Sequence, residues 1–148
     1  MARWRNGRGT LVVGPAETGA SGHGDPAAET AADTAEPWAG GPVTVPLEIA
    51  ASYRARTHGL LGRDGIQGAI LLSPANNVHT FRMRFPIDVA YLDRKLRVVA
   101  VRTMRPNRLG AIRLRARHVL ESEAGTMADW GIRPGVRVAV REPDGRDA

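Results

Sequence analysis

Short apolar runs separated by turn-forming residues are the feature that most limits how this chain can fold. Between residues 43 and 49 every second residue is apolar, which is the period of a strand with one buried face. Pro46 cannot donate a hydrogen bond to a neighbouring strand, so this strand is expected at a sheet edge. Further runs of strand length occur at residues 68–72, 87–92, 96–103, 117–121 and 136–140. A chain built from such runs is expected to form a sheet.

Two short helical segments are predicted between these strands. Ser52 can cap a helix that runs to about His58, and Gly59 can end it. Residues 125–130 suggest a helical turn that ends at Gly131. With a further edge strand at residues 11–13, the chain has about seven short strands and one or two short helices. The predicted fold class is therefore α+β, mainly antiparallel, with the sheet curled into a small half-barrel.

The segment from residue 14 to residue 41 interrupts this pattern. It contains no Leu, Ile or Val and is rich in Ala, Gly, Pro, Glu and Thr. Such a segment cannot bury enough apolar surface to offset its ordering entropy, so it is predicted to be disordered. The chain is thereby divided into an N-terminal strand segment (1–13), a disordered loop (14–41), one folded domain (42–142) and a disordered tail (143–148).

The densest mixture of polar and apolar residues lies between Val78 and Asp88. Its eleven positions hold a histidine, a threonine, two arginines and an aspartate among large apolar side chains. Solvated loops rarely contain so many aromatic and β-branched residues, and buried strands rarely contain so many ionisable ones. The segment is therefore predicted to be a strand whose polar face lines a site, with His79 beside Phe81 and Met83.

Four blocks in the folded part carry a resemblance to known proteins. They are residues 53–63 (YRARTHGLLGR), 78–89 (VHTFRMRFPIDV), 119–125 (VLESEAG) and 131–136 (GIRPGV). Together they resemble the DUF 192 family, bacterial and archaeal proteins whose activity is not established. Arg82 departs from the family pattern, where a small residue such as glycine is usual, and Val136 replaces a usual acidic residue. The resemblance implies a compact β-rich fold and no particular reaction.

His79, Asp88 and Glu121 are the candidates for catalysis. His79 suits a general base, a ligand contact or a metal ligand, and equally a hydrogen-bonding residue that holds a strand end. For Asp88 a salt bridge to Arg84 that fixes the strand register is preferred. Glu121 either joins the other two candidates in one cluster or is a surface carboxylate near Arg117.

The candidate ligand-binding residues are Thr80, Arg82 and Arg84 in the mixed segment, with Arg56 and Arg63 in the first of the four blocks. A guanidinium group can hold an anion through its fork of N–H donors, although such arginines more often pair with acids across a fold. The sequence contains no recognised motif for a metal, a nucleotide or a nucleophilic serine. No metal and no cofactor are therefore predicted.

Basic residues are concentrated between Arg94 and Arg117, where nine cationic side chains occur without an acidic one, in a chain of net charge +6. Such a stripe can bind nucleic acid or an acidic partner. Aromatic residues do not interleave the arginines as single-strand binders require, so nucleic acid is not the preferred partner. The sequence shows no secretory signal and no membrane span, and a cytoplasmic monomer without membrane contact is expected.

Three functions are consistent with these residues. The preferred one is a small binding or accessory module whose polar-lined concavity holds a small anionic ligand. The second is a hydrolase or lyase that uses His79 with Asp88 or Glu121 as acid and base. The third is an interaction protein that binds nucleic acid or an acidic partner through the basic loop at residues 102–117.

Overall fold

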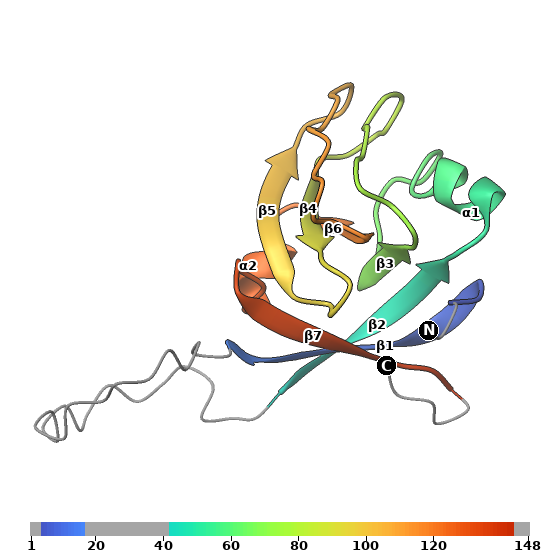
Figure 1. Cartoon of the computed structure of the whole chain (residues 1–148). Helices are drawn as coiled ribbons and strands as arrows, with labels where there is room; N and C mark the ends of the chain where they lie inside the picture. Colours follow the sequence, from blue (N-terminus) through green and yellow to red (C-terminus); the bar gives the residue numbers. More distant parts are fainter. Residues whose placement is uncertain (1–3, 17–41, 144–148) are drawn as a thin grey trace, which may run out of the picture.

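Seven strands form one sheet in the order β5-β4-β6-β3-β2-β1-β7 in the computed structural model, which describes residues 4–16 and 42–143 (Figure 1). The strands are β1 (Gly7–Ala16), β2 (Val43–Ala50), β3 (Ala69–Leu72), β4 (Ile87–Leu92), β5 (Val98–Met104), β6 (His118–Glu123) and β7 (Val136–Arg141). The helices are α1 (Tyr53–His58) and α2 (Thr126–Asp129). All neighbouring strands are antiparallel except β2 and β3. The predicted fold class is confirmed.

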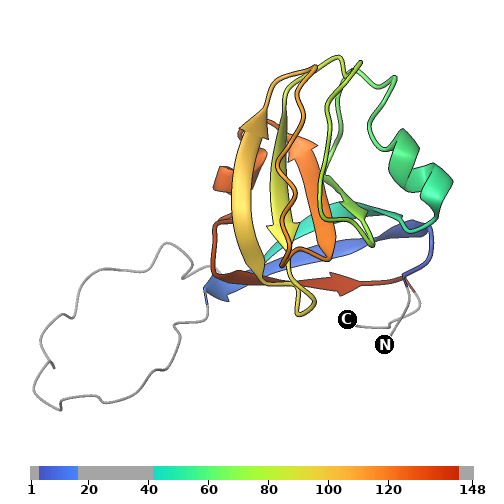
Figure 2. The same ribbon diagram turned by 45° about the horizontal axis from the view of Figure 1, so that its top comes forward.

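The sheet curls until its two outermost strands, β5 and β7, approach each other. The Val138 N–H donates to the Leu96 carbonyl at 3.0 Å, and the Gly135 N–H donates to the Val98 carbonyl at 2.9 Å. Figure 2 shows β1 and β7 crossing beneath the more upright strands β4, β5 and β6. These contacts make the sheet a half-barrel that is closed at the end where β5 begins.

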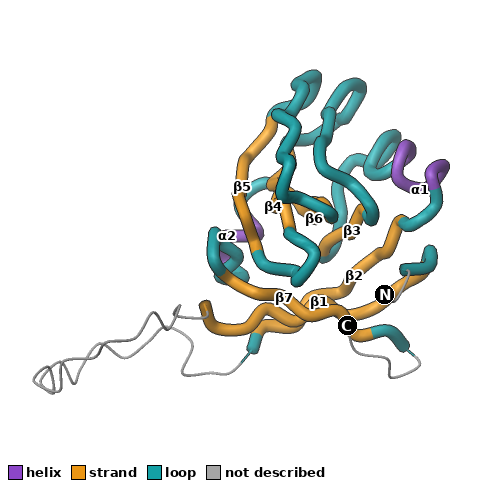
Figure 3. Tube along the Cα trace, viewed as in Figure 1, coloured by secondary structure: helices purple, strands orange, loops and turns teal. Residues whose placement is uncertain are grey.

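Each face of the sheet carries its own apolar core. The first core fills the inside of the half-barrel and includes Leu92, Leu120 and Met127, together with side chains from β1, β2 and β7. The second core includes Val89 and Val119, and it is covered by loops that appear in teal above β3, β4 and β6 in Figure 3. Because successive residues of a strand point to opposite faces, neighbours in β4 and β6 belong to different cores.

The two strands predicted at a sheet edge lie inside the sheet. β1 lies between β2 and β7, and β2 pairs with β1 on one side and β3 on the other. Pro46 is tolerated there because the pairing with β3 begins only at Leu47. The Pro46 carbonyl faces Gly68, where an added Cβ would lie 2.1 Å from that oxygen. The missing N–H of Pro46 therefore falls just before the ladder with β3, where no donor is required.

The segment from residue 78 to residue 86 is not a strand, contrary to the prediction. It is a loop with a turn at Phe81 and Arg82, and β4 begins only at Ile87. Arg82 has φ 61°, in the left-handed region that favours glycine. The small residue usual at this position in the family was a signal for this turn. The loop folds back at this turn, where the Met83 N–H donates to the Thr80 carbonyl. The alternation of polar and apolar side chains therefore reflects the folding of the loop and not the geometry of a strand.

The other predicted elements are close to the observed ones. The Ser52 hydroxyl accepts a hydrogen bond from the Ala55 N–H at 3.1 Å, and Gly59 ends α1 as predicted. Of the stretch predicted to be disordered, residues 14–16 belong to β1, and residues 17–41 lie outside the described part of the chain, as do residues 144–148. Within the described residues, no helix has the length and apolar character needed to cross a bilayer.

Candidate functional site

A pocket of about 80 Å³ opens between the end of α1 and the loop that contains His79. It has room for a few water-sized groups, so a ligand inside it must be small. Its lining comes from three parts of the chain that are distant in sequence: Arg56, Thr57, His58, Gly59, Leu60 and Leu61; Leu72, Asn77, Val78, His79 and Met83; and Glu121. Of the residues that the sequence predicts for catalysis or ligand binding, the pocket therefore brings together His79, Glu121 and Arg56.

Among the described residues, Glu121 is the only carboxylate that lines the pocket, and it is only 4% exposed. In the sheet it lies between Ile70 of β3 and Val89 of β4, on the face of the second core. Its carboxyl makes no hydrogen bond or ion pair with any residue that the structure describes. Burial raises the pKa of Glu121 to about 7. The alternative that Glu121 is a surface carboxylate near Arg117 is therefore wrong.

Four nitrogen-bearing side chains line the pocket with this acid: Arg56, His58, Asn77 and His79. Arg56 is held by hydrogen bonds from its guanidinium to the backbone carbonyls of Pro74 and Ser52. His58 is the last residue of α1, and His79 is exposed on the opposite loop. The imidazole of His79 stacks on the ring of Phe81 with centroids 5.2 Å apart, so these two side chains are neighbours as predicted. The pocket thus combines a buried acid with one permanent positive charge and two imidazole rings.

Asp88 does not reach this pocket. In the ladder between β4 and β6, Asp88 lies opposite Ser122, whereas Glu121 lies opposite Val89. Residues that pair directly in a sheet share a face and adjacent residues point to opposite faces, so the two carboxyl groups lie on opposite sides of the sheet. A cluster that contains both Asp88 and Glu121 is excluded by this register.

The carboxylate of Asp88 instead fixes the start of α2. Its Oδ1 accepts a hydrogen bond from the Thr103 hydroxyl at 2.7 Å. Its Oδ2 accepts from the backbone N–H groups of Gly125 at 2.8 Å and Met127 at 3.2 Å. Three donors from two other segments thus converge on one buried side chain, which is the arrangement of a structural residue.

The predicted salt bridge between Arg84 and Asp88 is wrong. Arg84 pairs with Asp64 at 3.2 Å, and both side chains of this pair are largely exposed. The reason is the loop conformation of residues 78–86, which removes the strand alternation on which the predicted pairing depended.

Two further predicted ligand-binding arginines also lie away from the pocket lining. Arg63 makes a bidentate pair with Glu48, with N–O distances of 3.0 and 2.8 Å, and this hydrogen bonding raises the pKa of Arg63. Arg82 is exposed at its turn, where its backbone N–H donates to the Asn107 side chain at 3.0 Å. The guanidinium fork of Arg63 is thus engaged by a carboxylate of the protein itself.

Thr80 is fully buried between the two loops at this end of the molecule. Its hydroxyl donates to the Arg105 carbonyl at 2.6 Å and accepts from the Arg108 N–H at 2.9 Å. Its backbone carbonyl accepts from the Asn107 N–H at 2.7 Å. Thr80 therefore joins the loop before β4 to the loop after β5.

Replacing Thr80 with valine is expected to lower the free energy of unfolding by about 2 kcal/mol, because it leaves the Arg108 N–H and the Arg105 carbonyl without their partner. Urea unfolding measures the change. Thr80→Ser keeps the hydroxyl and should lose much less. Equal losses in the two variants would contradict this expectation, because they would show that the methyl group, which serine lacks and valine keeps, matters as much as the hydroxyl.

Sequence reasoning did not single out His58 and Asn77 as pocket residues. His58 lies in one of the four family-like blocks, where the pattern indicates only the end of a helix. Asn77 falls in a segment whose composition indicates only a loop. The fold brings both residues to the pocket through the packing of α1 against the loop after β3, and no local pattern reports that contact.

A second polar pair lies outside the pocket lining. The Ser73 hydroxyl and Nδ1 of His118 are 2.7 Å apart, and burial lowers the pKa of His118. Ser73 is buried, so a substrate has no direct access to its hydroxyl. Among the residues described, no three His, Asp or Glu side chains lie close enough together to hold a metal ion.

Comparisons with known proteins identify relatives of the chain. Residues 35–140 match the model of the DUF192 family, named "Uncharacterized ACR". The UPF0127 protein PH1112 of Pyrococcus horikoshii is 32% identical over 84 residues, which cover 53% of this chain and 73% of that protein.

Two solved structures have the same fold. A proposed transcription regulator, R01717 of Sinorhizobium meliloti 1021, has a TM-score of 0.65 at 17% identity, covering 94% of this chain and 98% of that one. A protein of unknown function from Novosphingobium aromaticivorans has a TM-score of 0.60 at 22% identity, covering 79% and 99%. At such identities these likenesses support the fold alone.

Proposed function

The chain belongs to the DUF192 family, and we propose that it is a binding module whose pocket at Glu121 holds a small anionic ligand. Family membership supplies no reaction, so the proposal depends on the pocket itself. The observation that carries it is the buried carboxyl of Glu121, which has no partner among the described residues. A buried polar group without a partner destabilises a fold, and such groups concentrate at binding sites.

The charges around the pocket favour an anion over a cation. With a pKa of about 7, Glu121 is largely protonated below neutral pH and can donate a hydrogen bond to a ligand oxygen. Arg56 supplies a permanent positive charge whose position is fixed by two backbone carbonyls. His58 and His79 provide further N–H donors. A carboxylate or a tetrahedral oxyanion matches this set of donors, and the pocket volume restricts it to small acids.

A second candidate is a hydrolase or lyase in which Glu121 and His79 act as acid and base. The pKa of Glu121 favours this candidate, because a general acid works best when its pKa lies near the operating pH. Asp88 has no part in it, since its carboxylate faces the first core.

Titration calorimetry with acetate, lactate and sulfate tests the binding proposal, because these anions keep their charge across neutral pH. The wild-type protein should bind at least one of them, and more weakly as the pH rises through about 7, because ionised Glu121 repels an anion. Glu121→Gln keeps an N–H donor and should retain binding with a weaker pH dependence than that of the wild-type protein, because the contribution of Glu121 is removed.

The matched charge variants are Arg56→Gln and Arg54→Gln. Both arginines belong to α1, but only Arg56 lines the pocket. Arg56→Gln should weaken binding by about tenfold, the effect of losing one charge-assisted hydrogen bond, and Arg54→Gln should leave it unchanged. The proposal fails if the wild-type protein binds none of the three anions, or if the two arginine variants behave alike.

A further inference from the structure

Two segments, residues 78–85 and 105–117, form a surface strip that we call the rim. It starts at the loops at the top of Figure 1, and residues 112–117 continue it down to the start of β6, where the Arg117 N–H donates to the Leu92 carbonyl at 2.8 Å. The rim carries most of the large apolar side chains that the described residues expose. Leu109, Ile112 and Leu114 are 69%, 64% and 83% exposed, and Phe81 is 46% exposed. Exposed aliphatic side chains gathered in one place mark a surface that contacts another apolar phase or partner.

The backbone of the rim is fixed, so these side chains are held outward. The Thr80 N–H donates to the Arg108 carbonyl, and the Gly110 N–H donates to the Val78 carbonyl, both at 2.8 Å. An isolated bridge between His79 and Leu109 joins the same two loops. The aliphatic side chains are therefore exposed on a backbone that hydrogen bonds hold in place.

Arginines surround these aliphatic residues. In the sequence Ile112-Arg113-Leu114-Arg115 the two kinds of side chain alternate, and Arg105 and Arg108 precede them, with no acidic residue between positions 94 and 117. Among the described residues, none of the rim arginines in 105–117 makes a salt bridge to an acid. An arginine can lay its aliphatic stem along apolar surface while its head group reaches a phosphate.

We propose that the rim binds the surface of an anionic lipid bilayer, with Ile112 and Leu114 entering the interface and the exposed arginines Arg105, Arg108 and Arg115 contacting lipid phosphates. Interfacial binding needs apolar insertion together with positive charge, and the rim supplies both. Nucleic acid would account for the arginines and could stack on the His79–Phe81 ring pair, but it would leave the exposed aliphatic side chains Leu109, Ile112 and Leu114 without a role. The sequence expectation of no membrane contact rested only on spanning and signal segments, and this proposal is independent of the pocket ligand.

Co-sedimentation of the full-length protein with vesicles tests the proposal. Binding is expected to mixed phosphatidylserine–phosphatidylcholine vesicles, to weaken with added salt, and to be absent with phosphatidylcholine alone. The double variant Ile112→Ser/Leu114→Ser should bind at least about tenfold more weakly, since it removes two side chains that would be buried in the interface. Both side chains are exposed, so the fold should be unaffected, and a thermal melt verifies this.

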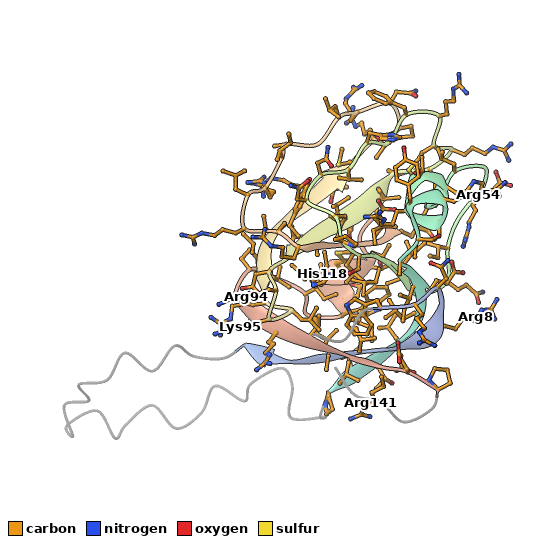
Figure 4. The ribbon with its side chains drawn as sticks, turned by 45° about the vertical axis from the view of Figure 1, so that its right-hand side comes forward. Arg8, Arg54, Arg94, Lys95, His118 and Arg141 are labelled. Carbon is orange, nitrogen blue, oxygen red and sulfur yellow. The ribbon has the colours of Figure 1, made fainter. Side chains whose placement is uncertain are left out.

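The matched charge comparison uses Arg105→Gln/Arg115→Gln in the rim and Arg8→Gln/Arg54→Gln on β1 and α1 (Figure 4). Arg8 and Arg54 are exposed and belong to neither segment of the rim. The rim pair should weaken vesicle binding, whereas the second pair should not. Equal binding to neutral vesicles, equal losses in both pairs, or no vesicle binding together with tight binding of an oligonucleotide would each overturn the proposal. Glu121→Gln should bind vesicles like the wild-type protein. Vesicle binding by the rim can then be distinguished from anion binding in the Glu121 pocket.

Discussion

Glu121→Gln is expected to stabilise the protein by about 3 kcal/mol above neutral pH and to change its stability little near pH 4. The pKa of Glu121 rises from 4.5 to about 7 on folding because the side chain is buried. Between these two values the folded state binds a proton that the unfolded state has released, so the stability of the wild-type protein falls as the pH rises. Each pKa unit corresponds to about 1.4 kcal/mol, which gives the expected size.

Urea unfolding of both proteins between about pH 4 and about pH 8 measures this effect. The difference in unfolding free energy should grow through this range and then level off, because glutamine has no charge to bury. Glu123→Gln is the matched control, since Glu123 lies in the same strand but is exposed. Its curve should run parallel to that of the wild-type protein. A parallel curve for Glu121→Gln as well would mean that the Glu121 carboxyl finds a partner that offsets its burial.

A stabilising effect of this size would also bear on function. A residue that lowers stability at neutral pH and lines a pocket is held there for a reason other than folding. The same variant is expected to weaken the pH dependence of anion binding, so a single substitution tests the energetic and the functional argument in separate experiments.

Periodicity predicted most of the fold but could not assign the faces of the sheet. All six residues of β4 are buried, and so are four of the six residues of β6. Since each face of these strands packs against a core, alternation of apolar and polar residues no longer distinguishes inside from outside. For the same reason the sequence left open whether Glu121 and Asp88 converge, and only the register of β4 with β6 answers this.

The mixed segment misled the prediction for a different physical reason. The residues from Val78 to Phe85 alternate in polarity as a strand would, but Arg82 adopts a left-handed conformation and the loop reverses there. Its buried members, such as Thr80, are satisfied by backbone groups of the loop after β5. Those partners are more than twenty residues away in the sequence, so local patterns contain no information about them.

Asp88→Ala is expected to lower the free energy of unfolding by about 4 kcal/mol, a larger loss than that expected for Thr80→Val. It would remove the acceptor of the Thr103 hydroxyl and leave the Gly125 and Met127 N–H groups without a partner at the start of α2. Hydrogen bonds to a charged group are each worth about 1.5–3 kcal/mol, and the loss of several that share one acceptor is less than additive. Urea unfolding at neutral pH measures the loss.

Asp88→Asn distinguishes a structural role from a catalytic one. Its amide oxygen can still accept from Gly125 and Met127, and its NH₂ group can donate to the Thr103 hydroxyl, so most of the stability should return. Asp64→Ala is the control for loss of an acid, and it should change stability little because its pair with Arg84 is exposed. Because Asp88 faces the first core, Asp88→Asn should also leave anion binding at the Glu121 pocket unchanged. Loss of that binding in a stably folded Asp88→Asn protein would contradict the separation of the two carboxyl groups by the sheet.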